Sequence, residues 1–182
     1  MSKKVLLILA EGFEEIEAIT IIDILRRAGV NLCVHSLEPG LVSGAHGLQV
    51  QSEGDIHQNS YDDYDAVVLP GGLPGSDNLL ASERVGELVK EFNAQAKLVA
   101  AVCAAPMVLG AHGLLEGKKA TCYPGFEEKL LGATCVEDKV VLVDNVLTSR
   151  GPGTTADFAY EIVKILVSEK TAQELSQGML FA

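Results

Sequence analysis

Cys103 is the residue whose setting points most directly to chemistry. It follows an uncharged apolar run, residues 98–102, which is typical of a strand buried on both faces of a parallel sheet. Small residues, Ala104 and Ala105, and then Pro106 begin a segment compatible with a helix. At such a junction, backbone N–H groups and the helix dipole favour a thiolate. We therefore expect Cys103 to be a nucleophile with a lowered pKa; the competing interpretation is an inert thiol in the core.

Three acidic residues lie at the start of the first expected helix. Glu14, Glu15 and Glu17 precede or begin an apolar pattern of helical spacing that runs to about residue 28. Acidic residues at a helix N-terminus complement its dipole, and most have no further role. This helix follows a buried strand, residues 5–9, so its first turn belongs to the same sheet edge as Cys103. One of the three glutamates could face the thiol, and the residues alone leave open which one.

A glycine turn is expected at the same edge. Pro70, Gly71 and Gly72 directly follow a third buried strand, residues 65–69. Glycines permit positive φ and a close approach of the backbone, so this turn could offer an N–H group to an anion. A tight turn without a binding role is the equally simple alternative.

The order of elements predicts an α/β fold. The first strand, its helix and a second strand over residues 30–36 form a βαβ unit, which predicts a parallel sheet with a right-handed crossover. The pattern indicates one domain over residues 1–182. Further helices are expected over residues 82–93, 104–112 and 125–131, and Thr154 should cap a last helix whose apolar positions are Phe158, Ile162, Ile165 and Leu166. We also expect a hairpin over residues 41–52, with an exposed His46 at its tip. A strand is expected over residues 120–123, and paired strands over 140–143 and 146–149.

Composition and charge exclude several function classes. The chain has 182 residues, of which 25 are acidic and 14 basic, for a formal net charge of −11. Without a basic cluster, we expect no nucleic-acid or membrane partner, and without a signal or spanning segment we expect a cytoplasmic location. The four cysteines and four histidines are scattered along the chain. Their spacing predicts neither disulfides nor a metal site.

Four segments together resemble a known family. They are residues 10–17 (AEGFEEIE), 67–72 (VVLPGG), 101–106 (AVCAAP) and 148–154 (TSRGPGT). They are similar to the signature blocks of the ThiJ/PfpI superfamily, in the branch of the parkinsonism-associated protein DJ-one and its bacterial relatives. The resemblance covers almost the whole chain. It implies a flavodoxin-like three-layer sandwich, a mainly parallel sheet with a nucleophile elbow, and a homodimer.

The resemblance also implies a site. Cys103 corresponds to the family's reactive cysteine, and Glu17 to the glutamate that contacts it. Gly72 and Ala104 match the positions whose backbone N–H groups form an oxyanion hole, with Gly71 beside them in the turn. A protonated carboxyl at Glu17 would donate a hydrogen bond to the sulfur, and an ionised one would serve as a general base.

The sequence departs from the family pattern at one position near the cysteine. Many members carry a histidine where this chain has Tyr123, and a phenol is a poor proton shuttle at neutral pH, although it can donate a hydrogen bond. His46 falls near where dimeric relatives present a basic side chain to the partner subunit; a surface-loop histidine is the alternative. Ala104 follows the nucleophile where the peptidase branch has a histidine, so we expect no intrinsic proteolysis.

Together with these residues, the resemblance implies a cofactor-independent glyoxalase or deglycase. Its substrate would be a small carbonyl compound such as methylglyoxal, or a thiol or amine adduct of one, with Cys103 as nucleophile and Glu17 as acid and base. The alternative is an oxidative-stress sensor or chaperone-like protein whose Cys103 is oxidised to the sulfinate. A role in thiamine-thiazole synthesis follows from family naming alone, and the sequence has no phosphate loop to support it.

Overall fold

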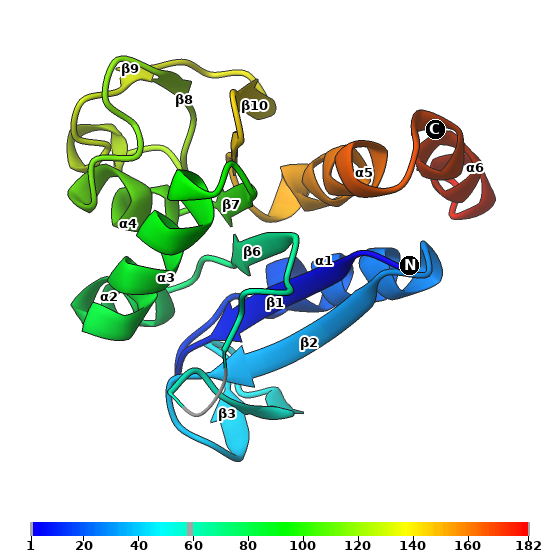
Figure 1. The fold of residues 1–182 in the computed structure, drawn as a ribbon, viewed down its shortest axis with the longest axis horizontal. Helices are drawn as coiled ribbons and strands as arrows, with labels where there is room; N and C mark the ends of the chain where they lie inside the picture. The colour runs from blue at the N-terminus through cyan, green and yellow to red at the C-terminus, as the bar shows by residue number, and fades with distance from the viewer. Residues whose placement is uncertain (1, 58–59, 182) are drawn as a thin grey trace.

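The computed structural model describes residues 2–57 and 60–181, and a seven-stranded sheet forms its centre (Figure 1). Neighbouring strands are parallel, except that the strands of residues 140–143 and 146–149, at one edge of the sheet, form an antiparallel pair. The mainly parallel sheet predicted from the sequence is confirmed. In spatial order the strands are β10 (Val140–Val143), β11 (Val146–Ser149), β7 (Leu98–Val102), β6 (Ala66–Leu69), β1 (Lys4–Leu9), β2 (Asn31–Ser36) and β5 (Gly54–Asp55).

Helices cover both faces of this sheet. Successive side chains of a strand point to opposite faces, so Leu7 of β1 joins one core while Leu6 and Ile8 join the other. The expected three-layer sandwich is therefore confirmed. No helix in the described part of the chain has the length and apolar character needed to cross a membrane. One face carries α1 (Glu15–Arg27), α5 (Thr155–Leu166) and α6 (Glu169–Gly178), and the other carries α2 (Gly75–Ala81), α3 (Glu83–Ala94) and α4 (Pro106–Ala111).

Two small sheets lie outside the central one. The predicted hairpin is confirmed as the antiparallel pair β3 (Leu41–Ser43) and β4 (Gln49–Gln51). The strand predicted over residues 120–123 is wrong in extent, because β8 (Lys119–Ala120) ends before the site residue Tyr123 and pairs with β9 (Thr134–Cys135). The helix predicted over 125–131 is only a 3₁₀ turn, Glu127–Lys129.

The start of α5 differs from the prediction. Thr154 precedes the helix, but its side chain makes no capping hydrogen bond to it. Its hydroxyl instead accepts a hydrogen bond from the Gly151 N–H at 3.1 Å and lies 2.8 Å from the Ser149 hydroxyl. The Thr154 hydroxyl is therefore hydrogen-bonded within the preceding turn and does not cap the helix. Ile165, expected to be buried, is one of the exposed large apolar residues.

Three neighbouring strands fix where a site can form. β7, β6 and β1 are adjacent and parallel, so their carboxyl ends meet at one edge of the sheet. The chain leaves these ends at Cys103, at the turn Pro70–Gly72, and at the turn that leads into α1. In open α/β sheets, ligands bind at this edge.

Candidate functional site

Cys103 occupies a tight turn between β7 and α4. Its φ is +65°, a left-handed conformation that costs a non-glycine residue about 1–2 kcal/mol. Neighbouring segments hold it there: the Cys103 N–H donates to the carbonyl of Ser149 at 3.0 Å, and the Tyr123 N–H donates to the Cys103 carbonyl at 2.9 Å. The residue is 9% exposed. This is the geometry of the nucleophile elbow that the sequence predicted.

Glu17 faces the Cys103 thiol from the first turn of α1. Its side chain is fully buried and interacts with the thiol as a hydrogen-bonding neighbour. One carboxyl oxygen, Oε2, accepts a hydrogen bond from the Gly71 N–H at 2.7 Å. The other, Oε1, is buried and has no hydrogen-bond partner of good geometry among the described residues. Of the three glutamates at this helix start, Glu17 is thus the one that the fold directs to the sulfur.

The close approach of Cys103 and Glu17 requires glycine in the turn after β6. A Cβ on Gly71 would lie 2.5 Å from the Cys103 Cβ and 2.7 Å from the Glu17 Oε2, so no side chain fits there. Gly72 has a φ of +95°, which L-residues rarely adopt. The Gly71 N–H is engaged by Glu17 and is not free for an oxyanion, in contrast to what we expected of it. The N–H groups of Gly72 and Ala104 are directed at the Cys103 sulfur.

Burial dominates the ionisation of the pair. Desolvation raises the pKa of Glu17 to about 7, although hydrogen bonds from Cys103 and Gly71 act in the opposite direction. Burial also raises the pKa of the Cys103 thiol, and the neighbouring Glu17 carboxylate raises it further. The Gly72 and Ala104 amides favour the thiolate but do not outweigh these effects. The lowered pKa predicted from the elbow pattern is therefore wrong: the pKa of the thiol is raised, and that of the Glu17 carboxyl is raised to about 7.

The thiol opens on a cavity of about 420 Å³, a size that suits a small organic molecule. Tyr123 and Phe126 line it from the segment after α4, and Glu14 lines it from the N-cap of α1. His46, from the tip of the β3–β4 hairpin, lines it as well.

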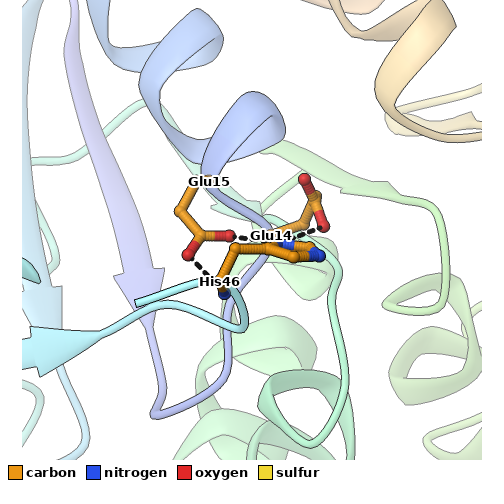
Figure 2. A group of neighbouring side chains, drawn as sticks. All are labelled: Glu14, Glu15 and His46. Atoms are coloured by element: carbon orange, nitrogen blue, oxygen red, sulfur yellow. Dashed lines mark hydrogen bonds and ion pairs between the residues drawn. The ribbon is translucent and has the colours of Figure 1, made fainter. Parts of the chain in front are cut away.

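Glu15 holds this hairpin tip against α1, as Figure 2 shows. Its buried carboxylate accepts hydrogen bonds from the backbone N–H groups of His46 at 2.6 Å and Leu48 at 3.4 Å. Its second oxygen lies 2.8 Å from the His46 Nδ1. Gly44 makes room for the carboxyl, because a Cβ there would overlap it. The tip is fixed through Glu15 rather than free in solvent.

This contact sets the charge of His46. The imidazole side chain is 71% exposed, and the hydrogen bond to Glu15, with the nearby Glu14 carboxylate, raises its pKa above the ordinary value. Burial opposes ionisation of Glu15, but its bonds from His46 and the backbone outweigh burial and lower its pKa. The contact therefore favours a carboxylate–imidazolium pair.

The same three side chains place potential metal ligands within 4.8 Å of one another, which the scattered histidines of the sequence did not predict. Ion pairing accounts for the arrangement, because Glu14 Oε2 and Glu15 Oε2 lie 3.6 Å and 2.8 Å from the His46 Nδ1. Both carboxylates also sit at the N-terminus of α1, where the helix dipole favours anions and opposes an added cation.

Comparison with known proteins decides the family. Residues 3–165 match the model of the DJ-1/PfpI family. This chain belongs to the DJ-1/PfpI family. Protein dj-1beta of Drosophila melanogaster is 42% identical over 185 residues, which cover 100% of this chain and 99% of that protein. Its crystal structure has a TM-score of 0.93 at 40% identity and covers 99% of this chain and 98% of its own.

Two further members span nearly the same length. The structure titled Toxoplasma gondii DJ-1, oxidized, has a TM-score of 0.93 at 36% identity and covers 98% of each chain. A Pyrococcus abyssi protein named a deglycase is 32% identical over 165 residues, which are 90% of this chain and 99% of that protein. Membership of the DJ-1 branch and the flavodoxin-like fold, both expected from the sequence, are confirmed.

Around its elbow, this DJ-1/PfpI protein brings together most of the residues singled out in the sequence. Cys103, Gly72, Ala104, Tyr123 and His46 line one cavity, and Glu17 lies behind the thiol. The contact of Glu15 with the hairpin was missed, because the sequence offered this residue only as a dipole partner or as one of three candidates to face the thiol. The available signal was its position: side chains two residues apart on a helix diverge by about 200°, so Glu15 and Glu17 must serve different neighbours.

Replacing Glu17 with Gln tests the raised pKa of this carboxyl. The folded protein holds the Glu17 proton up to about pH 7, whereas the ordinary value is 4.5, so its contribution to stability is present below pH 4.5 and lost as pH rises through 7. The variant lacks this loss. Urea unfolding should therefore show Glu17→Gln gaining about 3 kcal/mol relative to wild type between pH 4.5 and pH 7.5. The exposed Glu128→Gln should show no such trend, and a pH-independent difference for Glu17→Gln would contradict the assignment.

Proposed function

We propose that this protein is a cofactor-independent glyoxalase or deglycase acting on small dicarbonyls such as methylglyoxal or on their thiol and amine adducts. The observation that carries the proposal is the buried Glu17 carboxyl, with a pKa of about 7, facing the thiol of Cys103 at the wall of a cavity. A general base works best when its pKa lies near the operating pH. Within the family, the deglycase name of the 32% identical Pyrococcus abyssi protein supports the same class of reaction.

The geometry suits activation of the thiol by a base. Because Cys103 rests as a thiol, the Glu17 carboxylate takes its proton as Sγ attacks the aldehyde carbon. The carbonyl oxygen gains negative charge next to the sulfur, where the N–H groups of Gly72 and Ala104 can donate to it. Glu17 then passes this proton to the oxygen, which gives a hemithioacetal and leaves the carboxylate ionised again. Moving its C1 proton to C2 gives a lactoyl thioester, and hydrolysis then releases lactate and restores the thiol.

Oxidation of Cys103 is the second candidate function. The Gly72 and Ala104 N–H groups that surround the sulfur are also placed to donate to the oxygens of a sulfinate, and a protonated Glu17 can donate as well. Peroxide would convert the thiol first to sulfenic and then to sulfinic acid, with one water released at each step. The related Toxoplasma gondii structure is titled as oxidized, which supports this chemistry in the family.

We also infer that the chain forms a homodimer. Ile16 and Ile19 lie on the exposed side of α1, and Leu48 lies on the adjoining hairpin, whose N–H bonds to Glu15. Ile16 is 58% exposed and Leu48 60%. Clustered exposed apolar residues of this size mark interaction surfaces. The patch adjoins Glu14 and His46, so a partner there would border the cavity.

Lactate formation from methylglyoxal tests the enzymatic proposal. Wild type should produce lactate at a rate that rises through about pH 7, as Glu17 ionises. The rate of Cys103→Ser should be at least about a hundredfold lower than that of wild type. Cys135→Ser, at an exposed cysteine, is the matched control and should keep the wild-type rate. Equal lactate from wild type and Cys103→Ser would remove the proposal.

Mass spectrometry after mild peroxide treatment tests the second candidate. Cys103 should accumulate as the sulfinic acid, because the surrounding donors stabilise that form, while Cys33, Cys122 and Cys135 are modified to a lesser extent. Glu17→Ala, which removes one donor, should reduce the sulfinate yield at Cys103. Oxidation spread evenly over the four cysteines would rule out a selective sensor.

Light scattering coupled to size exclusion tests the dimer. Wild type should elute at twice the 19.3 kDa mass of the chain, and Ile16→Lys should shift it toward the monomer because a charge replaces apolar contact. Leu131→Lys, at a similarly exposed apolar residue outside α1 and the hairpin, should not. A monomeric wild type would refute the inference.

A further inference from the structure

A histidine lines the cavity at Cys103. Among the described residues, His46 is the one histidine that lines this cavity. The others are placed elsewhere: His35 is buried against the Tyr61 hydroxyl, the His112 ring packs beside Gly86, and His57 lines a different cavity. Tyr123 also lines the cavity, but a phenol exchanges its proton poorly at neutral pH.

Glu15 orients the ring of His46 in two ways. It anchors the backbone through the His46 N–H at 2.6 Å, and it engages Nδ1 at 2.8 Å, so both the chain and the imidazole are fixed by one buried carboxylate (Figure 2). Among the described residues, Nε2 has no protein hydrogen-bond partner. A carboxylate that holds one ring nitrogen and leaves the other free is the arrangement that prepares a histidine for proton transfer.

We propose that Glu15 and His46 form a proton-transfer dyad for the Cys103 cavity, in which Glu15 is the positioning residue and the His46 Nε2 exchanges protons with the bound substrate. This inference rests on the glyoxalase or deglycase function proposed above. It assigns the hairpin tip a part in the reaction, where the sequence left a surface-loop histidine as the alternative.

The dyad completes the proton balance of the hemithioacetal rearrangement. Glu17 takes the proton from C1, the electron pair forms a C1=C2 bond, and the C2 carbonyl oxygen takes a proton from the His46 Nε2. Glu17 then returns its proton to C2, while the hydroxyl on C1 gives its proton back to Nε2 as the thioester carbonyl forms. Both side chains finish as they began. Hydrolysis of the thioester consumes one water and needs no oxidant or reductant.

The groups around His46 favour the protonated form that the first transfer needs. Glu14 and Glu15, both at the start of α1, face the ring, and Cys103 lies across the same cavity with Glu17 behind it. The two nearer carboxylates favour the imidazolium, so its pKa is raised. The protonated ring can donate to a carbonyl oxygen, and the ionised part of the Glu17 population can accept the C1 proton.

The test compares pH profiles of kcat/KM for methylglyoxal. Wild type should rise through about pH 7 as Glu17 ionises and fall again on the alkaline side as His46 loses its proton. His46→Gln should lower kcat/KM by about a hundredfold and lose the alkaline fall. Added imidazole should restore part of the rate of His46→Ala. The matched control, His57→Gln, changes an exposed histidine outside this cavity and should leave rate and profile unchanged.

The outcomes separate this inference from the proposed function. If wild type and Cys103→Ser make lactate equally, the proposed function fails and the dyad fails with it. If lactate depends on Cys103 but His46→Gln keeps both the wild-type rate and the alkaline fall, the dyad alone is overturned. NMR titration of the His46 ring provides a readout without turnover: Glu15→Gln should lower the His46 pKa, and an unchanged pKa would overturn the positioning role.

Discussion

The contact that the rest of the site depends on is the burial of the Glu17 carboxyl against the Cys103 thiol. Burial raises the pKa of both groups, and the Glu17 carboxylate raises that of the thiol further. The backbone accommodates this contact at a cost. Cys103 adopts a left-handed conformation, and Gly71 must lack a side chain so that its N–H can reach Glu17. Three adjacent parallel strands bring these segments together at one edge of the sheet.

This contact determines how the sulfur becomes reactive. A cysteine that rested as a thiolate would be nucleophilic in the absence of substrate and readily oxidised. In the reaction that we propose, the thiol keeps its proton until the Glu17 carboxylate removes it, so bond formation and proton transfer occur in the same place. The hairpin carrying His46 is held by a second carboxylate, Glu15, on the same helix turn. Glu17 thereby supports the thiol of this cavity, and Glu15 supports the hairpin that lines it.

The sheet and the elbow could be predicted because uncharged apolar runs such as residues 98–102 have few structural interpretations. Other features had no comparable signal. The helix α2 has seven residues and follows a turn, so no apolar period develops, and α6 is mostly polar with Ala172 as its one buried residue. The pairing of Glu15 with His46 joins residues 31 apart and depends on how the hairpin folds back. The sign of the Cys103 pKa shift depended on burial depth, which a local pattern does not contain.

The most direct test of this account is the ultraviolet absorbance of the Cys103 thiolate, followed with pH as the difference between wild type and Cys103→Ser. Burial beside Glu17 predicts that no thiolate from Cys103 appears below about pH 8.5, the ordinary range for a cysteine. In Glu17→Gln, the step should move to lower pH, because the repelling carboxylate is gone. A wild-type step below neutral pH would contradict the account, since the sulfur would then be ionised before any base acts on it.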